Sequence, residues 1–148
     1  MKKRIVIAAF AGALLSLHAW SQDATPVGLW KTIDDNSGKP KALIRITEGG
    51  GEFKGTIEKL FQEPGQLPNP TCDKCEDARK DQPIIGMAIV TGMKKQGDEF
   101  AGGTILDPKN GKVYKSKMTL ADGGKKLNVR GYIGMPMLGR TQVWVREE

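Results

Sequence analysis

Histidine is nearly absent from this sequence, and the only one, His18, lies in an N-terminal segment that we expect to be removed. A mature chain without histidine excludes Ser-His-Asp and Cys-His catalysis, most catalytic zinc sites and the usual histidine pH switch. Serine is scarce as well, because only Ser37 and Ser116 follow that segment, and neither lies in a G-x-S-x-G nucleophile elbow. The sequence therefore favours a protein that is not an enzyme.

Long hydrophobic runs are missing except near the N-terminus. A basic start at residues 2–4 leads into an uncharged apolar stretch, 5–17, that is too short to span a bilayer. The stretch ends at Ala19-Trp20-Ser21, a small-x-small pattern that predicts signal-peptidase cleavage after the serine. No cysteine lies there, as a lipoprotein would require. We expect a signal peptide at 1–21 and a single exported domain at 22–148, periplasmic or secreted, with no transmembrane segment.

The excess of positive charge is small once the signal peptide is set aside. The whole chain has a net charge of +6, but three of its 23 Lys and Arg residues lie in the signal peptide, so the mature charge is +3. This value suits solubility and lacks the basic footprint of a nucleic-acid-binding protein. We therefore expect no nucleic-acid partner. The mature chain is also long enough to bury a core without a metal or cofactor, and none is expected.

Helical periodicity is absent after the signal peptide. Short segments rich in β-branched and aromatic residues alternate instead with clusters of Gly, Pro, Asn and Asp, which predicts antiparallel strands joined by turns. The expected strands are Leu29–Ile33, Ala42–Thr47, Glu52–Leu60, Ile84–Met93, Glu99–Leu106, Lys112–Leu120, Lys126–Ile133 and Thr141–Arg146. This count and spacing predict an all-β fold, an eight-stranded antiparallel up-and-down barrel.

One connection, Phe61 to Pro83, is unusually long and holds both cysteines. Cys72 and Cys75 form a C-x-x-C pair, and in an oxidising compartment we expect them to form a local disulfide. A redox-active pair is an alternative, although no βαβ context surrounds it. Metal binding is a third, with oxygen donors nearby, but a zinc site would need further good ligands. We expect no metal site here. Met135 and Met137 could form a soft-metal pair, but more often such residues line a core or cavity.

Gly28-Leu29-Trp30 near the mature N-terminus resembles the G-x-W pattern of lipocalin-like proteins. In that pattern a late arginine covers the indole, and here Trp144 and Arg146 lie in the last expected strand. The resemblance implies that Trp30, Trp144 and Arg146 pack at one end of the barrel, with a cation on an aromatic face.

A longer series of motifs covers nearly the whole mature chain. It includes the segments at 28–32 and 38–40, the C-x-x-C pair, Ile105-Leu106-Asp107-Pro108-x-Asn110-Gly111-Lys112-x-Tyr114, and Arg130-Gly131-Tyr132-Ile133-Gly134 followed by Leu138-Gly139-Arg140-Thr141-Gln142-x-Trp144. In order and spacing these resemble the bacterial exported domain-of-unknown-function-2147 family. The resemblance implies a secreted or periplasmic lipocalin-like barrel with no established activity.

The expected barrel and export favour a binding protein whose interior holds one small apolar ligand, such as a fatty acid or lipid fragment. The predicted lining residues are Met87, Ile89, Tyr114, Met118, Leu120 and Tyr132. A barrel filled by its own side chains is the alternative, and it would make the protein an envelope scaffold or a module that binds an envelope partner through the long connection. Thiol-disulfide exchange at the two cysteines is a minor alternative.

Overall fold

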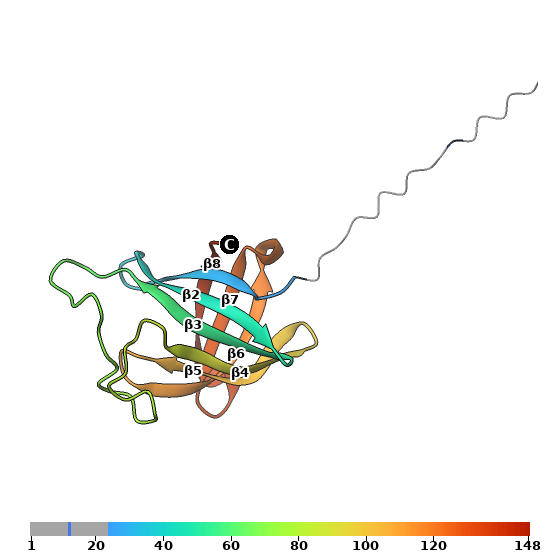
Figure 1. Ribbon diagram of the computed structural model, residues 1–148. Coiled ribbons are helices and arrows are strands. Elements are labelled where there is room, and N and C mark those ends of the chain that lie inside the picture. The colour runs from blue at the N-terminus through green and yellow to red at the C-terminus, as the bar shows by residue number, and fades with distance from the viewer. Residues whose placement is uncertain (1–11, 13–23) are drawn as a thin grey trace, which may run out of the picture.

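The computed structural model describes residues 12 and 24–148, so the predicted signal peptide and its cleavage site lie almost wholly outside the described residues. Eight antiparallel strands close into a barrel in chain order (Figure 1). The strands are β1 (Gly28–Ile33), β2 (Pro40–Gly49), β3 (Glu52–Leu60), β4 (Ala88–Gln96), β5 (Glu99–Asp107), β6 (Lys112–Ala121), β7 (Lys126–Tyr132) and β8 (Gly139–Arg146). The predicted barrel is confirmed. No helix within 24–148 has the length and apolar character needed to cross a membrane.

Alternating side chains explain why these segments form the barrel wall. In β6, Ser116 and Met118 are fully buried, whereas Lys115 between Tyr114 and Ser116 is exposed.

The turns form where the sequence predicts them. After β1, Asp34 accepts hydrogen bonds from the backbone N–H groups of Asn36 and Ser37, at 3.0 and 2.7 Å. Such local side-chain bonds favour a turn over a continued strand.

Only the third strand has its predicted bounds; most of the others differ by one or two residues at an end, and the starts of the fourth and eighth have a clear structural reason. The fourth was expected from Ile84, but β4 begins at Ala88. Gly86 has a φ of +90°, and the N–H of Met87 donates to the carbonyl of Ile84 at 3.1 Å, so the chain turns just before the strand. The eighth begins at Gly139, two residues earlier than expected, because Gly139 pairs with Tyr132 of β7. A short 3-10 helix, η2 (Pro136–Leu138), precedes it.

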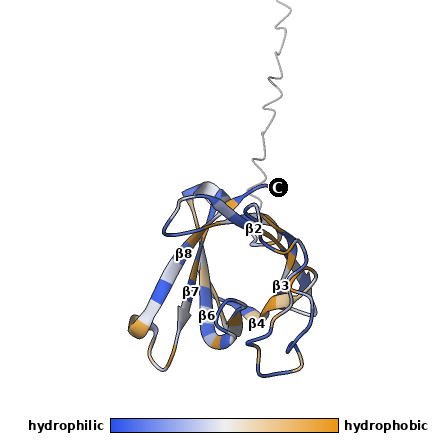
Figure 2. Cartoon of the chain, turned by 90° about the vertical axis from the view of Figure 1, so that its left-hand side faces the viewer, coloured by the Kyte–Doolittle hydropathy of each residue, from blue (hydrophilic) through white to orange (hydrophobic). Residues whose placement is uncertain are grey.

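The antiparallel order gives the barrel two distinct ends. At one, which we call the closed end, lie the start of β1, the end of β8 and the turns β2–β3, β4–β5 and β6–β7. At the other, the open end, lie the connections β1–β2, β3–β4, β5–β6 and β7–β8. Figure 2 looks toward the open end, where the long β3–β4 connection lies outside the ring of strands.

Large side chains fill the closed half of the barrel. Its largest fully buried side chains are Trp30, Ile46, Met93, Met118 and Leu127. The rings of Phe53 and Phe100 meet edge to face, with centroids 4.9 Å apart, a favourable arrangement for an aromatic pair. Burial of these apolar groups is the main stabilising contribution of this half.

The seam between β1 and β8 is much shorter than the others. Only Trp30 with Arg146 and Lys31 with Val145 are paired across it, whereas β7 and β8 share seven register pairs. Both pairs lie toward the closed end. The barrel is therefore closed firmly at that end and loosely toward the open end.

Candidate ligand-binding cavity

A cavity of about 980 Å³ occupies the open half of the barrel. Every strand contributes to its wall. The deeper wall is largely aliphatic and aromatic and includes Ala42, Ile44, Ile57, Ile89, Ile105, Tyr114, Val129 and Trp144. Cavities that hold small ligands commonly have such a size and a mainly apolar lining with a few polar groups. The wall thus has the chemistry of a site for an apolar molecule.

The mouth of the cavity is charged. Seven ionisable residues line it: Asp34, Lys39, Lys41, Glu63, Asp107, Lys109 and Arg140. Some are already paired, since Lys39 lies 3.4 Å from Glu63 and Arg140 forms an ion pair with Asp35. The hydrogen bond from the backbone N–H of Ser37 is the main cause that lowers the pKa of Asp34. The polarity of the lining therefore rises from the floor toward the solvent.

The cavity also reaches the loose seam of the barrel. Thr32 on β1 and Gln142 on β8 both line it, and neither pairs across the seam. Gln142 accepts a hydrogen bond through Oε1 from the indole N–H of Trp144, at 3.4 Å. Trp144 lines the cavity and is only 1% exposed, so its ring forms part of the cavity floor.

At the closed end, Trp30 and Arg146 form a plug. The guanidinium carbon of Arg146 lies 4.3 Å from the centre of the Trp30 ring, and Trp30 donates its indole N–H to the carbonyl of Pro26 at 2.8 Å. Arg146 also donates to three carbonyl oxygens, those of Thr25, Val27 and Gly124, at 2.7 to 2.8 Å. Burial lowers the pKa of Arg146, and the carbonyls and the aromatic face replace its lost water.

Comparison with known proteins agrees with this architecture. Residues 28–146, most of the chain, match the family described as "Uncharacterized protein conserved in bacteria (DUF2147)". The chain belongs to the DUF2147 family. Comparison with the curated proteins found no match.

A solved structure similar to this DUF2147 barrel is protein HP1028 from the human pathogen Helicobacter pylori, which is described as belonging to the lipocalin family. The two share 16% sequence identity, with a TM-score of 0.71 over 84% of each chain. At this identity the likeness establishes the lipocalin-like fold.

Half of the residues predicted to line a ligand site do line the cavity of this DUF2147 protein. They are Ile89, Tyr114 and Tyr132. The other three, Met87, Met118 and Leu120, lie outside its lining, so the placement needs correction there. Met118 is fully buried opposite Phe100 and Val129 in the closed half, and Leu120 lies opposite Leu127.

Met87 lies in the turn before β4, and its carbonyl accepts the N–H of Ile57 at 3.0 Å. The inward-facing side chains of β6 lie at different depths in the barrel. Those near the open end line the cavity, and those near the closed end are part of the filled core. The residues missed were the inward positions of other strands, among them Ile44, Ile57, Ile105 and Gln142. The same alternation of inward and outward residues predicts these positions. The sequence does not show, however, where along the barrel the filled core ends and the cavity begins.

The two cysteines form the expected disulfide, Cys72–Cys75. Both are buried, and the segment that holds them packs against the β5–β6 turn, where a Cβ at Gly111 would overlap the carbonyl of Lys74. The N–H of Cys72 donates to the carbonyl of Gln82 at 2.9 Å. Within 24–148 there is no group of three or more His, Cys, Asp or Glu side chains placed to hold a metal ion.

Ser116 is a fully buried polar residue on the inward face of β6. Its hydroxyl is buried, and among the described residues it is the one buried side-chain oxygen or nitrogen without a hydrogen-bond partner. Glycines flank it on both neighbouring strands, Gly103 on β5 and Gly131 on β7. Gly131 and Tyr114 line the cavity, so the hydroxyl lies at its inner limit.

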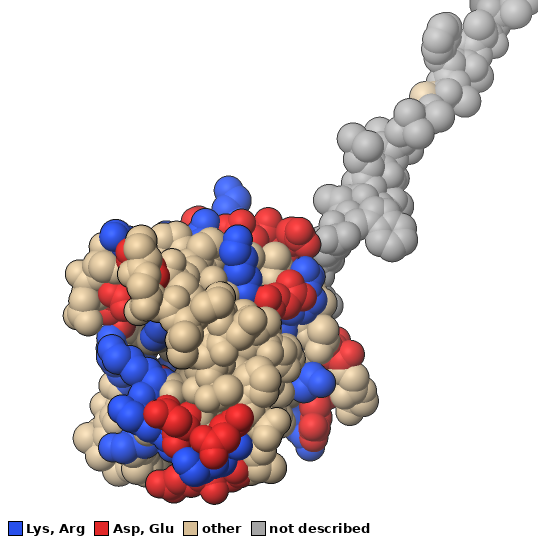
Figure 3. Space-filling model, turned by 60° about the vertical axis from the view of Figure 1, so that its left-hand side comes forward, with Lys and Arg blue, Asp and Glu red and all other residues tan. Residues whose placement is uncertain are grey.

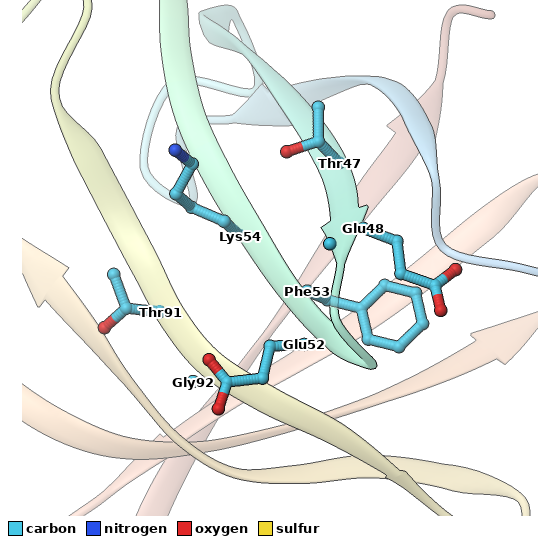
Figure 4. A pocket seen from close by; sticks show the side chains of 8 residues that line it. Thr47, Glu48, Glu52, Phe53, Lys54, Thr91 and Gly92 are labelled. Carbon is cyan, nitrogen blue, oxygen red and sulfur yellow. The ribbon is translucent and has the colours of Figure 1, made fainter.

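A second hollow, of about 300 Å³, lies near the β2–β3 hairpin at the closed end (Figure 4). Its lining includes Glu48, Glu52, Lys54 and Thr91, together with the ring of Phe53. Polar and charged side chains of a hairpin tip surround it. The larger cavity is therefore the better candidate for a binding site.

Proposed function

We propose that this protein is an exported, non-catalytic carrier that holds one small, largely apolar ligand in the open-end cavity. The observation that carries the proposal is the combination of a 980 Å³ cavity with a mainly apolar floor and a plug of Trp30 and Arg146 behind it. With the plug behind the cavity, a ligand would enter from the mouth, and its apolar part would lose contact with water.

The lining favours an amphipathic ligand such as a fatty acid or lipid fragment. The isoleucines and Trp144 would contact a hydrocarbon chain, while Lys41 and Lys109 at the mouth could contact an anionic headgroup. Among the described residues neither lysine has an ion-pair partner within 4.0 Å. A charged headgroup at the mouth would remain partly hydrated, which avoids the cost of burying it.

The two alternatives receive less support. A barrel filled by its own side chains describes the closed half, but the open half contains the cavity. Thiol-disulfide exchange requires a partner thiolate to reach a sulfur, and Cys72 and Cys75 are 0% and 2% exposed. Their burial supports a structural role, which is to hold the long connection against the β5–β6 turn.

Binding can be tested with N-phenyl-1-naphthylamine, a neutral probe whose fluorescence rises in apolar surroundings. We expect saturable uptake by the delipidated mature protein, displaced by a long-chain fatty acid. Ile105→Trp should reduce probe affinity at least tenfold, because Ile105 lines the cavity and the larger ring would occupy it. Val143→Trp is the matched control, since Val143 is exposed on β8.

Uptake that is equal in wild type and Ile105→Trp, with both proteins folded, would contradict the cavity as the binding site. Export is tested separately. The periplasmic or secreted form should begin at Gln22, and N-terminal sequencing of the purified protein checks this.

A further inference from the structure

The β7–β8 connection exposes an unusual concentration of apolar side chains. We call residues 133–138 the methionine loop. Its large apolar residues Ile133, Met135, Met137 and Leu138 are 64%, 58%, 74% and 70% exposed, and they make up four of the eight exposed large hydrophobics described for residues 24–148. Figure 2 shows the orange segment before β8 at the edge of the open end. Exposed apolar groups gathered in this way commonly mark a surface that contacts a partner.

The frame of the methionine loop is fixed rather than loose. Arg130 on β7 donates from Nε to the carbonyl of Pro136 at 2.6 Å and from Nη2 to that of Gly139 at 3.3 Å. Its Nη1 donates to the hydroxyl of Thr141 at 2.7 Å. Within the loop, the N–H of Leu138 donates to the carbonyl of Met135 at 2.9 Å. Hydrogen bonds therefore fix the backbone of the loop, which lowers the entropic cost of binding through it.

The wall beside the loop is positively charged. Strands β6, β7 and β8 contain seven Lys and Arg residues, three in β6 and two in each of the others, and no Asp or Glu. Of these seven, Arg140 lies at the cavity mouth and Arg146 in the plug, which leaves five for the outer wall. By contrast, β1 to β5 contain five acidic residues beside their own seven Lys and Arg residues. In Figure 3, basic side chains gather at the left of the face shown, and uncharged surface occupies its centre. The charge of the barrel is thus unevenly distributed.

Three of these cations lie on the outer wall close to the methionine loop. Lys115 is opposite Tyr132, the residue that precedes the loop, and Lys117 is opposite Arg130. Lys117 lies 3.6 Å from Glu99, whereas Lys115 has no acidic partner among the described residues. The hydrogen bonds of Arg130 go to neutral groups, so its charge is not neutralised either.

We propose that the methionine loop, with Lys115, Lys117 and Arg130 beside it, docks on the surface of an anionic lipid bilayer. The four apolar side chains would enter the boundary between headgroups and acyl chains, and the cations would contact anionic headgroups. Ile133 and Leu138 also line the cavity, so docking would bring its mouth to the lipid. Only this last consequence, direct transfer of an apolar ligand, rests on the proposed carrier function.

A bilayer fits this surface better than a protein partner does. A stable protein interface buries about 800 Å² on each side. The methionine loop has only six residues, four of them large, apolar and exposed. Insertion into a lipid surface needs only a few apolar side chains next to cations, because the free energy of burying the apolar groups and the electrostatic attraction to anionic lipids add together.

Vesicle co-sedimentation of the delipidated mature protein tests the proposal. Vesicles of phosphatidylethanolamine and phosphatidylglycerol should bind the protein, and vesicles of phosphatidylcholine alone should bind it at least about tenfold less. Met135→Ser with Met137→Ser should lower the partition coefficient about tenfold or more. Lys115→Gln with Lys117→Gln should lower it about tenfold at low salt and weaken its salt dependence.

Leu67→Ser is the matched control, since Leu67 is equally exposed but lies in the β3–β4 connection, away from the basic wall. It should leave the partition unchanged. A Met137→Trp variant adds an independent reading, because its fluorescence should shift to the blue with anionic vesicles and not with phosphatidylcholine. The substituted side chains are exposed or, at Lys117, half-buried, so circular dichroism should show unchanged folding.

No binding to anionic vesicles, or equal binding by the Met135→Ser/Met137→Ser variant, would overturn the proposal. A change in oligomeric mass caused by that variant, without a change in partition, would also overturn it and identify the loop as a protein interface. Ile105→Trp separates the two proposals, because it should block probe uptake and leave vesicle binding intact.

Discussion

The two ends of this barrel use the same strands for opposite purposes. At the closed end, Trp30 and Arg146 are covered and hydrogen-bonded, and large side chains fill the space between the walls. At the open end, the inward positions include isoleucines, a valine and a glycine beside Tyr114 and Trp144, and a cavity remains. The alternation of side chains is common to both halves. The alternation alone therefore does not show which half is filled and which half contains the cavity.

The closed end should therefore carry more of the stability than the open end. The largest expected effect is that of Arg146→Ala, which removes the cation from the Trp30 ring and leaves the carbonyls of Thr25, Val27 and Gly124 without their donor. We expect the free energy of unfolding to fall by about 2–4 kcal/mol in urea denaturation. Arg45→Ala, which removes exposed ion pairs with Glu58 and Glu148, should lower the free energy of unfolding far less. Equal losses would show that the plug contributes nothing special.

A pair of truncations compares the filled half with the hollow half. Met118→Ala should destabilise by about 3 kcal/mol, because Met118 is fully buried and its removal leaves a void. Ile105→Ala should cost only about 1 kcal/mol, because Ile105 already faces the cavity and loses fewer contacts. Thermal and urea unfolding of the unliganded proteins would measure both. A larger loss for Ile105→Ala would mean that the open half is packed.

Ser116 lies between the filled half and the cavity, and substitutions there test how the boundary is packed. Its hydroxyl is buried without a partner, so Ser116→Ala should leave stability unchanged or raise it by up to about 1 kcal/mol in the unliganded protein. Ser116→Val, which also replaces the hydroxyl but adds volume between two glycines, serves as a packing control. Destabilisation by more than about 1 kcal/mol in Ser116→Ala would show that the hydroxyl has a partner in solution.

The smallest expected effect concerns acid pH and the long connection at the open end. The guanidinium of Arg79 lowers the pKa of Asp77 from 3.8 to about 2. Arg79 also donates to the carbonyl of Ala88 at 3.0 Å, which ties the connection to β4. Asp77 is deprotonated in the folded protein down to about pH 2, but in the unfolded chain it takes up a proton near pH 3.8. The contribution of ionised Asp77 to folding stability is therefore complete above about pH 4 and is lost as the pH falls toward 2.

Limited proteolysis by pepsin between pH 4 and pH 2 would measure this effect. Cleavage of the connection should increase as the pH falls in wild type. Asp77→Asn should be cleaved at a rate that changes less over the same range. A wild-type rate that is independent of pH would contradict the assignment.

The sequence predicted the fold more fully than the site, for physical reasons. Alternation in β6 and the turn residues after β1 act locally, so the strand count, and most strand bounds to within one residue, could be read from them. The start of β4 could not, because a tertiary hydrogen bond from Ile84 to the carbonyl of Pro70 and the turn at Gly86 hold residues 84–87 outside the strand.

The depth of the cavity could not be predicted from the sequence either. Tyr114 and Met118 share one face of β6, yet one lines the cavity and the other is core. What separates them is the position of the Trp30 plug, and this is set by the registers of β1 with β2 and β8. Trp144 shows the same limit, because the barrel-end motif named it but did not show that its ring also lines the cavity floor.

The most direct test of the central claim is native mass spectrometry of mature protein purified from its own periplasm, before and after organic extraction. We expect a mass above that of residues 22–148 with one disulfide, and the excess should disappear on extraction and be recovered as an apolar molecule. A bare mass before extraction, together with no uptake of N-phenyl-1-naphthylamine afterwards, would contradict the claim that the open half of the barrel is a ligand site.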